Sequence, residues 1–489
     1  MMLRIGIFNN LAPQIKTTNM VETIRKSLRE SKAARFTALA IVAFMMLCGY
    51  YLADVMAPLK GLLEQQISWS SEEYGIFTSA YGWFNVFLFM LIIGGIILDK
   101  MGVRFTGLMA AVTMLIGISI KYWAVSTHSL DGVVWDVFFF EAKAQVLMAG
   151  LGFAVFGVGV EVAGITVSKI IVKWFKGKEM ALAMGLEMAT ARIGTGLAIG
   201  TSLPVANAFN DVSKPLLFGL VMAAIGLIAF IIYVFQDKKL DASEAAANEA
   251  NNTPAEEEES FKIRDIFKII TNKAWWYIAL LCVLFYSAVF PFLKYATDLM
   301  VNKFGVAENL AGTIPALLPF GTILLTPFFG NLYDRKGKGA SIMIIGSLLL
   351  IFVHSMFAIP MLNHYIIAII LIIILGIGFS LVPSAMWPSV PKIIPEKQLG
   401  SAYALIFWVQ NWGLMGVPAL IGWVLDTYCI TGTKVVEGVT VNTYDYTLPM
   451  MLFAGFGVLA LVFSFLLLIE DKKKGYGLQL PNIEHKEGE

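Results

Sequence analysis

Apolar residues follow one another along this chain in runs of about 20, separated by short stretches that hold most of the lysines and arginines. A helix of that length crosses the hydrocarbon of a bilayer. The runs lie at 37–59, 75–98, 105–126, 146–171, 181–206, 215–236, 274–299, 310–332, 340–361, 365–388, 400–425 and 447–469. They lack the alternation of a membrane-barrel strand, so the pattern predicts an all-α membrane protein with twelve transmembrane helices.

The basic residues orient these spans. With both termini in the cytoplasm, 28 of the 36 Lys and Arg fall in the tails and cytoplasmic loops, seven lie in or near the outer loops, and Arg192 lies within a span. This orientation obeys the positive-inside rule. The predicted divisions are a cytoplasmic tail (1–36), a six-helix bundle (37–237), a cytoplasmic linker rich in Ala, Asn and Glu (238–273), a second six-helix bundle (274–470) and a cytoplasmic tail (471–489).

The composition narrows the function. Hydrophobic residues make up 58% of the chain and charged residues 15%, against about 25% charged in soluble domains, which indicates an integral membrane protein. The net charge of +1 gives no field that would attract nucleic acid. The three cysteines and four histidines show no metal-ligand spacing, and no Walker, HExxH or Ser/His/Asp pattern is present. We therefore expect no metal, no cofactor and no enzyme activity.

Two charged residues lie deep inside apolar spans. Glu161 follows "FGVGV" in the fourth span, and Arg192 lies in "MATARIG" of the fifth. A charge at such depth is costly and marks a ligand, ion or proton site that faces the protein interior. Arginine keeps its charge and offers a fork of donors suited to a carboxylate. Alternatively, Glu161 is a neutral acid, or the two side chains form a permanent ion pair that only ties helices together.

Further polar and aromatic residues are candidates for substrate binding. Asp54, near the outer end of the first span, shares a helix face with Tyr50, and this pair could attract an ammonium group; a water-exposed Asp is the alternative. Amides and indoles can hydrogen-bond a peptide or a sugar, or the aromatic side chains can belong to interfacial belts. The candidates in the second half are Lys294, Trp387, Trp408, Gln410 and Asn411.

A short motif recurs at corresponding places in the two halves. The second span ends in "GIILDKMGVR" and the eighth in "GNLYDRKGKG", each a Gly-x-x-x-Asp-basic-x-Gly pattern. Glycines allow close helix approach, and the aspartates can hold basic groups across a gap in one state and release them in another; the basic residues could instead be only topology anchors. The predicted gating residues are Gly95, Asp99, Lys100, Gly102, Arg104, Gly330, Asp334, Arg335 and Gly337.

This repeat, with the central linker, resembles the major facilitator superfamily. The resemblance implies two bundles, a substrate site near the midplane between them, and alternating access. The stretches "FGVGVE", "KWFKGKE", "MATARIG" and "AMWPSVPKIIPEKQLGSAYALIFWVQNWGL" further resemble its lysosomal dipeptide uniporter branch. That resemblance implies dipeptides as substrates, no obligatory proton coupling, and the substrate's charged ends bound by Glu161 and Arg192.

The chain also departs from relatives of that kind. Phe153 stands where many proton-coupled members of the superfamily have an arginine, and "KYWAVSTHSLDGVVWDVFFFEAKAQ" is an insertion in which "WDVFFFEA" could be an amphipathic piece on the outer membrane surface. The basic N-terminal segment has no acidic dileucine signal, so we expect a plasma membrane, such as a bacterial inner membrane, rather than a lysosome. We expect a monomer, and the sequence says nothing of an accessory subunit.

Two other functions are compatible with these residues. A proton-coupled or exchange carrier for organic anions or amino acids would use Arg192 and Lys294 to bind carboxylates and Glu161 to carry a proton. A membrane sensor that binds but does not transport would use the same pocket, although it would have no need for the repeated gating motif.

Overall fold

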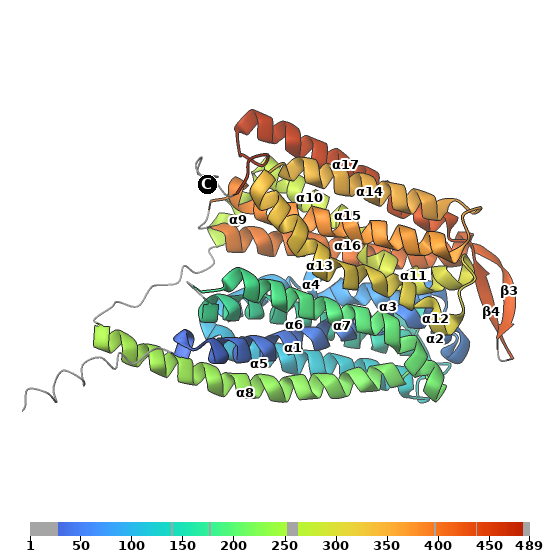
Figure 1. Cartoon of the computed structure of the whole chain (residues 1–489). Coiled ribbons are helices and arrows are strands. Elements are labelled where there is room, and N and C mark those ends of the chain that lie inside the picture. The colour runs from blue at the N-terminus through green and yellow to red at the C-terminus, as the bar shows by residue number, and fades with distance from the viewer. Residues whose placement is uncertain are drawn as a thin grey trace, which may run out of the picture.

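The chain folds into long, nearly parallel helices (Figure 1). The computed structural model describes residues 28–137, 140–175, 178–251, 263–395, 398–436 and 438–482. The first half holds η1 (Leu28–Glu30), α1 (Lys32–Asp54), η2 (Ala57–Leu59), α2 (Lys60–Ile67), α3 (Ser71–Ser79), η3 (Ala80–Gly82), α4 (Trp83–Phe87), α5 (Met90–Ser126), β1 (Val134–Val137), β2 (Phe140–Lys143), α6 (Ala144–Phe175), α7 (Met180–Phe209) and α8 (Lys214–Asn251). The second half holds α9 (Ile263–Ile270), α10 (Lys273–Ser287), α11 (Phe290–Asn302), α12 (Glu308–Ala311), α13 (Thr313–Lys336), α14 (Gly339–Ala358), α15 (Tyr365–Ile393), α16 (Leu399–Tyr428), β3 (Ile430–Val436), β4 (Val439–Tyr444) and α17 (Thr447–Lys474).

Each of the twelve predicted spans is occupied by helix. Within the described residues, ten helices are long and apolar enough to cross a membrane by length and composition. The other two spans are α7, which carries Glu187 and Arg192, and the stretch 75–98, which is broken into α3, η3, α4 and the start of α5. The fold is therefore that of an all-α membrane protein, consistent with twelve crossings and with both termini on one side.

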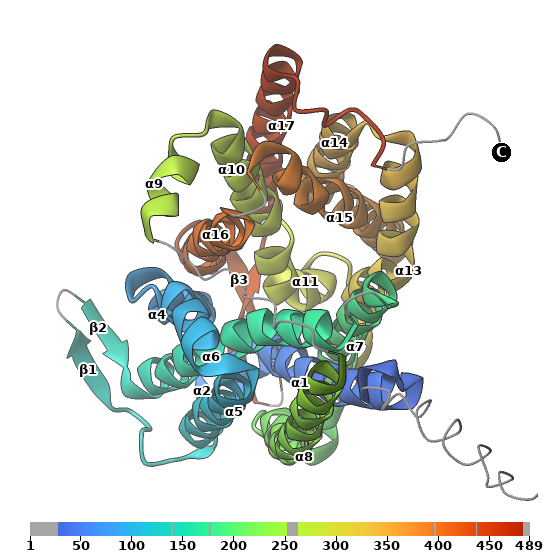
Figure 2. The same cartoon turned by 90° about the vertical axis from the view of Figure 1, so that its left-hand side faces the viewer.

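The two halves lie side by side, and their ends differ. Seen end-on in Figure 2, α1 and α5 to α8 form one group of helices, and α10 and α13 to α17 form the other. The first described residues, the end of α8 and the end of α17 gather at one end of the molecule, which we call the terminal end (Figure 1). The β3–β4 hairpin lies at the opposite end, which we call the hairpin end.

The repeated motif forms sharp corners at the terminal end. Gly102 breaks α5 with φ of 74°, and Gly337 ends α13 with φ of 67°, a backbone region that favours glycine. The expected close approach at the other two motif glycines is not seen, because a Cβ at Gly95 or Gly330 would meet nothing within 4 Å.

The described contacts of Asp99, Arg104 and Asp334 lie within their own halves. Asp99 lies 3.3 Å from Lys169 of α6, and Asp334 accepts a hydrogen bond of 2.8 Å from Asn482. Arg104 lies 2.5 Å from Asp241 of α8, whereas Lys100 and Arg335 are exposed. The proposed exchange of partners across a gap remains a prediction.

Helices α5 and α6 cross in close contact. A Cβ at Gly117 would lie 2.3 Å from the backbone nitrogen of Phe156, and a Cβ at Gly152 would lie 2.5 Å from the backbone nitrogen of Lys121. Small residues let two backbones approach this closely, which matters in lipid, where packing replaces the hydrophobic effect as the force between helices.

Two loops differ from the expectation. Within the insertion, residues 134–137 and 140–143 form the antiparallel β1–β2 hairpin, since β-branched and aromatic residues favour strands. Its place on the outer membrane surface stays a prediction. Helix α8 continues to Asn251, into the predicted linker, because Ala, Glu and Lys are strong helix formers. Residues 1–27, 252–262 and 483–489, within the predicted tails and linker, lie outside the described residues, as do 138–139 of the insertion.

Candidate substrate site

A cavity of about 340 Å³ lies between the two halves. This volume falls within the usual range for small-molecule sites. It runs from the middle of the bundle toward the terminal end, since Ser168 and Ile171 near the end of α6, and Met184 near the start of α7, line its outer part. Its polar lining residues include Tyr50, Asp54, Thr78, Tyr81, Glu161, Ser168, Glu187, Arg192, Tyr286, Lys294, Trp387 and Gln410.

The hairpin end is closed by polar contacts between the halves. Lys60 of α2 is 2% exposed and lies 3.1 Å from Asp298 of α11, with its ammonium 4.2 Å from the ring centre of Tyr444. Tyr446 also donates a hydrogen bond to Asp298. The buried ammonium of Lys60, from the first half, is thus enclosed by Asp298 and Tyr444 of the second half.

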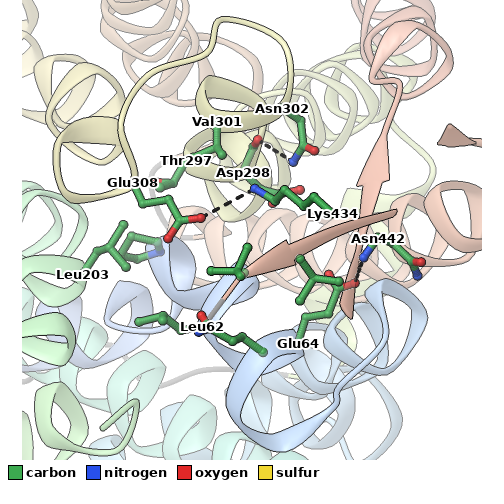
Figure 3. A pocket seen from close by; sticks show the side chains of 15 residues that line it. Leu62, Glu64, Leu203, Thr297, Asp298, Val301, Asn302, Glu308, Lys434 and Asn442 are labelled. Atoms are coloured by element: carbon green, nitrogen blue, oxygen red, sulfur yellow. Dashed lines mark hydrogen bonds and ion pairs between the residues drawn. The ribbon is translucent and has the colours of Figure 1, made fainter. Parts of the chain in front are cut away.

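The β3–β4 hairpin adds to this closure. Figure 3 shows Asn442 of β4 facing Glu64 of α2, and the backbone nitrogen of Asn442 donates a hydrogen bond of 2.7 Å to that carboxylate. Lys434 of β3 lies 3.6 Å from Glu308 within its own half. Within the described residues, the ion pairs between halves, Lys60–Asp298 and Lys294–Asp54, both lie toward the hairpin end. The cavity is therefore closed at the hairpin end and extends toward the terminal end.

Arg192 faces this cavity, and no described carboxylate lies within ion-pair distance of its guanidinium. Its guanidinium lies 5.7 Å from the ring centre of Tyr50, 5.5 Å from that of Phe290 and 5.2 Å from that of Phe379. It forms no ion pair or hydrogen bond with any residue that the structure describes, so a permanent pair with Glu161 is not present. Aromatic faces attract a cation but leave its donors free.

Besides Asp54, two carboxylates line the cavity together with Arg192. Glu161 accepts a hydrogen bond of 2.8 Å from the hydroxyl of Tyr81 on η3, which fixes its orientation. Glu187 lies in the cavity wall, and no hydrogen bond or ion pair connects it to the described residues. No ion pair joins Glu187 to Arg192, as their five-residue spacing predicts.

Asp54 and Lys294 form an ion pair across the halves. Their nearest oxygen and nitrogen are 2.6 Å apart, Lys294 also donates to the carbonyl of Ala53 at 2.7 Å, and Thr195 donates to Asp54 at 2.8 Å. Both residues line the cavity at its inner end. The expected acidic and aromatic patch is therefore divided, because Asp54 binds Lys294 while the ring of Tyr50 faces Arg192.

The amides and indoles of the second half fall into two groups. Gln410 lines the cavity and has no hydrogen bond within the described residues, and Trp387 lines it while donating to the hydroxyl of Tyr286 at 3.1 Å. Asn411 and Trp408 contact α4, where Asn411 accepts from Asn85 at 3.5 Å and Trp408 donates to the carbonyl of Val86 at 3.1 Å. The side chain of Asn411 also interacts with the carboxylate of Glu161. These two are outside the cavity lining.

Three polar residues were missed by the sequence reasoning. Glu187 belongs to a stripe of α7 residues (184, 187, 188, 191 and 192) at the i, i+3, i+4 spacing of one helix face, and that spacing could have revealed it. Tyr81 had no signal other than its position in a span. Lys121 was counted among the outer cations, but the structure buries it completely.

The comparisons with known proteins agree with this architecture. The sequence model of the Major Facilitator Superfamily matches residues 39–418 and 295–481. The chain is 27% identical over 406 residues to the lysosomal dipeptide transporter MFSD1 of Bos taurus, covering 81% of this chain and 80% of the relative. It is 26% identical over 405 residues to MFSD1 of Homo sapiens, covering 81% of each chain.

Solved structures share the fold at low sequence identity. A bacterial homologue of the human lysosomal transporter Spinster, in an inward-facing and unoccupied conformation, aligns with a TM-score of 0.66 at 13% identity, covering 91% of this chain and 98% of that one. The nucleoside transporter NupG aligns with a TM-score of 0.61 at 16% identity, covering 90% of this chain and 99% of that one.

Proposed function

This chain belongs to the major facilitator superfamily, and on that premise we propose that it carries dipeptides across a membrane by alternating access, as a uniporter. The observation that carries the proposal is Arg192, a guanidinium that forms no ion pair with any described residue and faces a cavity also lined by Asp54, Glu161 and Glu187. The curated relatives are named dipeptide transporters, which supports this choice of substrate.

The charges of the cavity suit the two ends of a dipeptide. Arg192 offers a planar fork of donors to the substrate carboxylate, and Glu161, oriented by Tyr81, accepts the substrate ammonium. Gln410, with its free amide, is placed to hydrogen-bond the peptide group. Tyr286 and Trp387 offer apolar surface to the side chains, while water fills the remaining volume.

Counting charges refines the substrate class. Asp54 and Lys294 neutralise each other, and a zwitterionic dipeptide would neutralise Glu161 and Arg192. Glu187 interacts electrostatically with Arg192 but would then have no cation of its own, which is costly in a cavity of low dielectric. A dipeptide with a lysine or arginine side chain would neutralise all three groups, so we propose that basic dipeptides are preferred over neutral ones.

The uniport mechanism follows from the resemblance and from Phe153. This side chain lines the cavity wall where many proton-coupled members of the superfamily carry arginine. Because position 153 holds a phenylalanine, it lacks the cationic group that the proton-coupled members carry there. This favours facilitated diffusion over proton symport.

Uptake of labelled dipeptides into proteoliposomes tests the proposal. We expect accumulation only to equilibrium, blocked by other dipeptides and unaffected by an imposed pH gradient or membrane potential. Uphill accumulation driven by protons would keep the substrate and overturn uniport. Transport of organic anions or amino acids in place of dipeptides would support the alternative carrier, and saturable binding without flux would support a sensor.

The membrane and the assembly are also proposals. We place the carrier in a plasma membrane because its basic N-terminal segment has no acidic dileucine signal, although the curated relatives are lysosomal by name and give this placement no support. Membrane fractionation with antibodies to the chain decides between a plasma membrane and a lysosomal membrane. Since one chain supplies both halves of the cavity, we propose that the monomer transports.

A further inference from the structure

Lys121 of α5 is a buried lysine without a carboxylate partner. It is 0% exposed, and its ammonium donates a hydrogen bond of 3.1 Å to the backbone carbonyl of Leu52. Its other neighbours are the rings of Phe153, at 4.2 Å, and of Phe77 and Phe156, each at 5.7 Å. No ion pair connects it to any described residue. A buried ammonium in such surroundings carries a large desolvation cost that one carbonyl and three rings offset only in part.

The packing of α5 keeps this ammonium near Asp54. The backbone of Lys121 lies at the close crossing with Gly152 of α6, so it moves with the first half. Its acceptor, Leu52, is two residues before Asp54 in the last turn of α1. Electrostatic interaction couples Lys121 to both Asp54 and Lys294, and the ring of Phe153 lies within 6.0 Å of the Lys294 ammonium as well.

The present partner of Asp54 belongs to the other half. Lys294 of α11 reaches Asp54 at 2.6 Å only while the halves touch at the hairpin end, where the hydroxyl of Tyr74 also donates to the carbonyl of Lys294 at 2.9 Å. Opening of the hairpin end would withdraw Lys294 and leave Asp54, which is 6% exposed here, with Thr195 alone. A carboxylate that loses its buried partner is strongly destabilised.

We infer that Lys121 is a positioning residue for transport: it replaces Lys294 as the counterion of Asp54 when the halves separate at the hairpin end. The other lysine at this end that joins the halves, Lys60, is held by Asp298 and Tyr444. Lys121 and Asp54 both belong to the first half, so their pair can persist while the second half moves away. The inference rests on the alternating access proposed above.

Distances between spin labels on the two halves test this exchange of partners. Phe209→Cys at the end of α7 and Leu310→Cys in α12 place labels on opposite halves at the hairpin end, at positions 67% and 55% exposed. The three native cysteines are buried. Full-length protein in liposomes, with and without a saturating dipeptide, gives the fraction of molecules open at that end.

We expect Lys121→Met to lower the hairpin-open fraction at least roughly tenfold, because removal of one buried charge leaves the other unpaired. Lys121→Arg should keep that fraction close to the wild-type value. In the Asp54→Asn background, Lys121→Met should not change the hairpin-open fraction any further. Lys143→Met is the matched control, since Lys143 lies at the same end and pairs with Glu73 of its own half.

Two results with the Lys121→Met variant would overturn the inference alone. One is an unchanged hairpin-open fraction in Lys121→Met. The other is the same loss in the Asp54→Asn background, which would make Lys121 a packing residue that acts without Asp54. A wild-type protein that never opens at the hairpin end, even with dipeptide, would refute alternating access itself and the inference with it, so the two failures are distinguishable.

Discussion

At the scale of single residues, the cavity is defined by charges that lack partners in the protein. Three aromatic rings surround Arg192, which keeps the guanidinium in place without occupying its donors. Asp54 and Lys294, by contrast, already occupy each other. Arg192 is therefore available to bind a substrate, whereas Lys294 is not, because Asp54 already neutralises it.

Arg192→Ala should abolish dipeptide binding while the protein remains folded, because the substrate carboxylate loses its bidentate donor. Arg192→Lys should weaken binding by roughly ten- to a hundredfold, since a lysine keeps the charge but not the fork. Isothermal titration of the purified variants measures both effects, with an unchanged melting temperature as the control for folding. Wild-type affinity in a folded Arg192→Ala variant would remove Arg192 from the site.

Glu187→Gln separates the two kinds of dipeptide. The affinity for a dipeptide with a lysine side chain should fall by roughly tenfold, because a charge pair of about 1.4 kcal/mol is lost. The affinity for a neutral dipeptide should stay the same or rise, since the unpaired carboxylate is gone. Competition against one labelled dipeptide gives both values. An equal loss for both substrates would mean that Glu187 does not contact the side chain.

At the scale of elements, close crossings and sharp corners decide where the side chains lie. The crossing of α5 and α6 places Lys121 behind the cavity wall, and the corner at Gly102 turns the chain from one span to the next. Glycine is required at the α5–α6 crossing because the two backbones touch there. It is required at the Gly102 corner because φ is positive there.

Gly117→Ala should destabilise the protein by about 1–3 kcal/mol, because its methyl group would lie 2.3 Å from the backbone of α6. Gly416→Ala is the matched control within α16, where a Cβ meets nothing within 4 Å, and we expect it to be neutral or stabilising by up to about 1 kcal/mol. Thermal unfolding in detergent compares the two. Equal melting temperatures would show that the α5–α6 crossing relaxes easily.

At the scale of the whole molecule, the two ends of the cavity differ in how the halves are joined. Buried ion pairs connect the halves toward the hairpin end, whereas at the terminal end the described contacts of the repeated motif join residues of one half. A carrier that works by rocking would exchange these arrangements, because one set of contacts must break when the other forms.

Lys60→Met should raise the fraction of molecules open at the hairpin end by at least roughly tenfold, since Asp298 would lose its buried partner. A membrane-impermeant thiol reagent added on that side reports the change through Thr78→Cys, a cavity position that is 4% exposed. Lys434→Met, which breaks an exposed pair within one half, should leave the reaction rate unchanged. An unaltered rate of thiol reaction in Lys60→Met would mean that this lysine does not hold the hairpin end closed.

Sequence by itself determined where the apolar runs lie and that Glu161 and Arg192 fall inside two of them. The physical reason is local: a span in lipid must satisfy its own backbone and present apolar side chains, so its length and its rare charges are visible in the order of residues. The repeated motif was visible for the same reason, because its corners need glycine wherever the chain turns.

Only the tertiary structure decided which charges remain unpaired. Asp54 and Lys294 are 240 residues apart and meet because the halves touch. Lys121 is buried because α5 crosses α6, and Trp408 leaves the cavity because α16 turns it toward α4. Each of these depends on contacts between elements distant in sequence, and no pattern within one span records which neighbour its side chains will face.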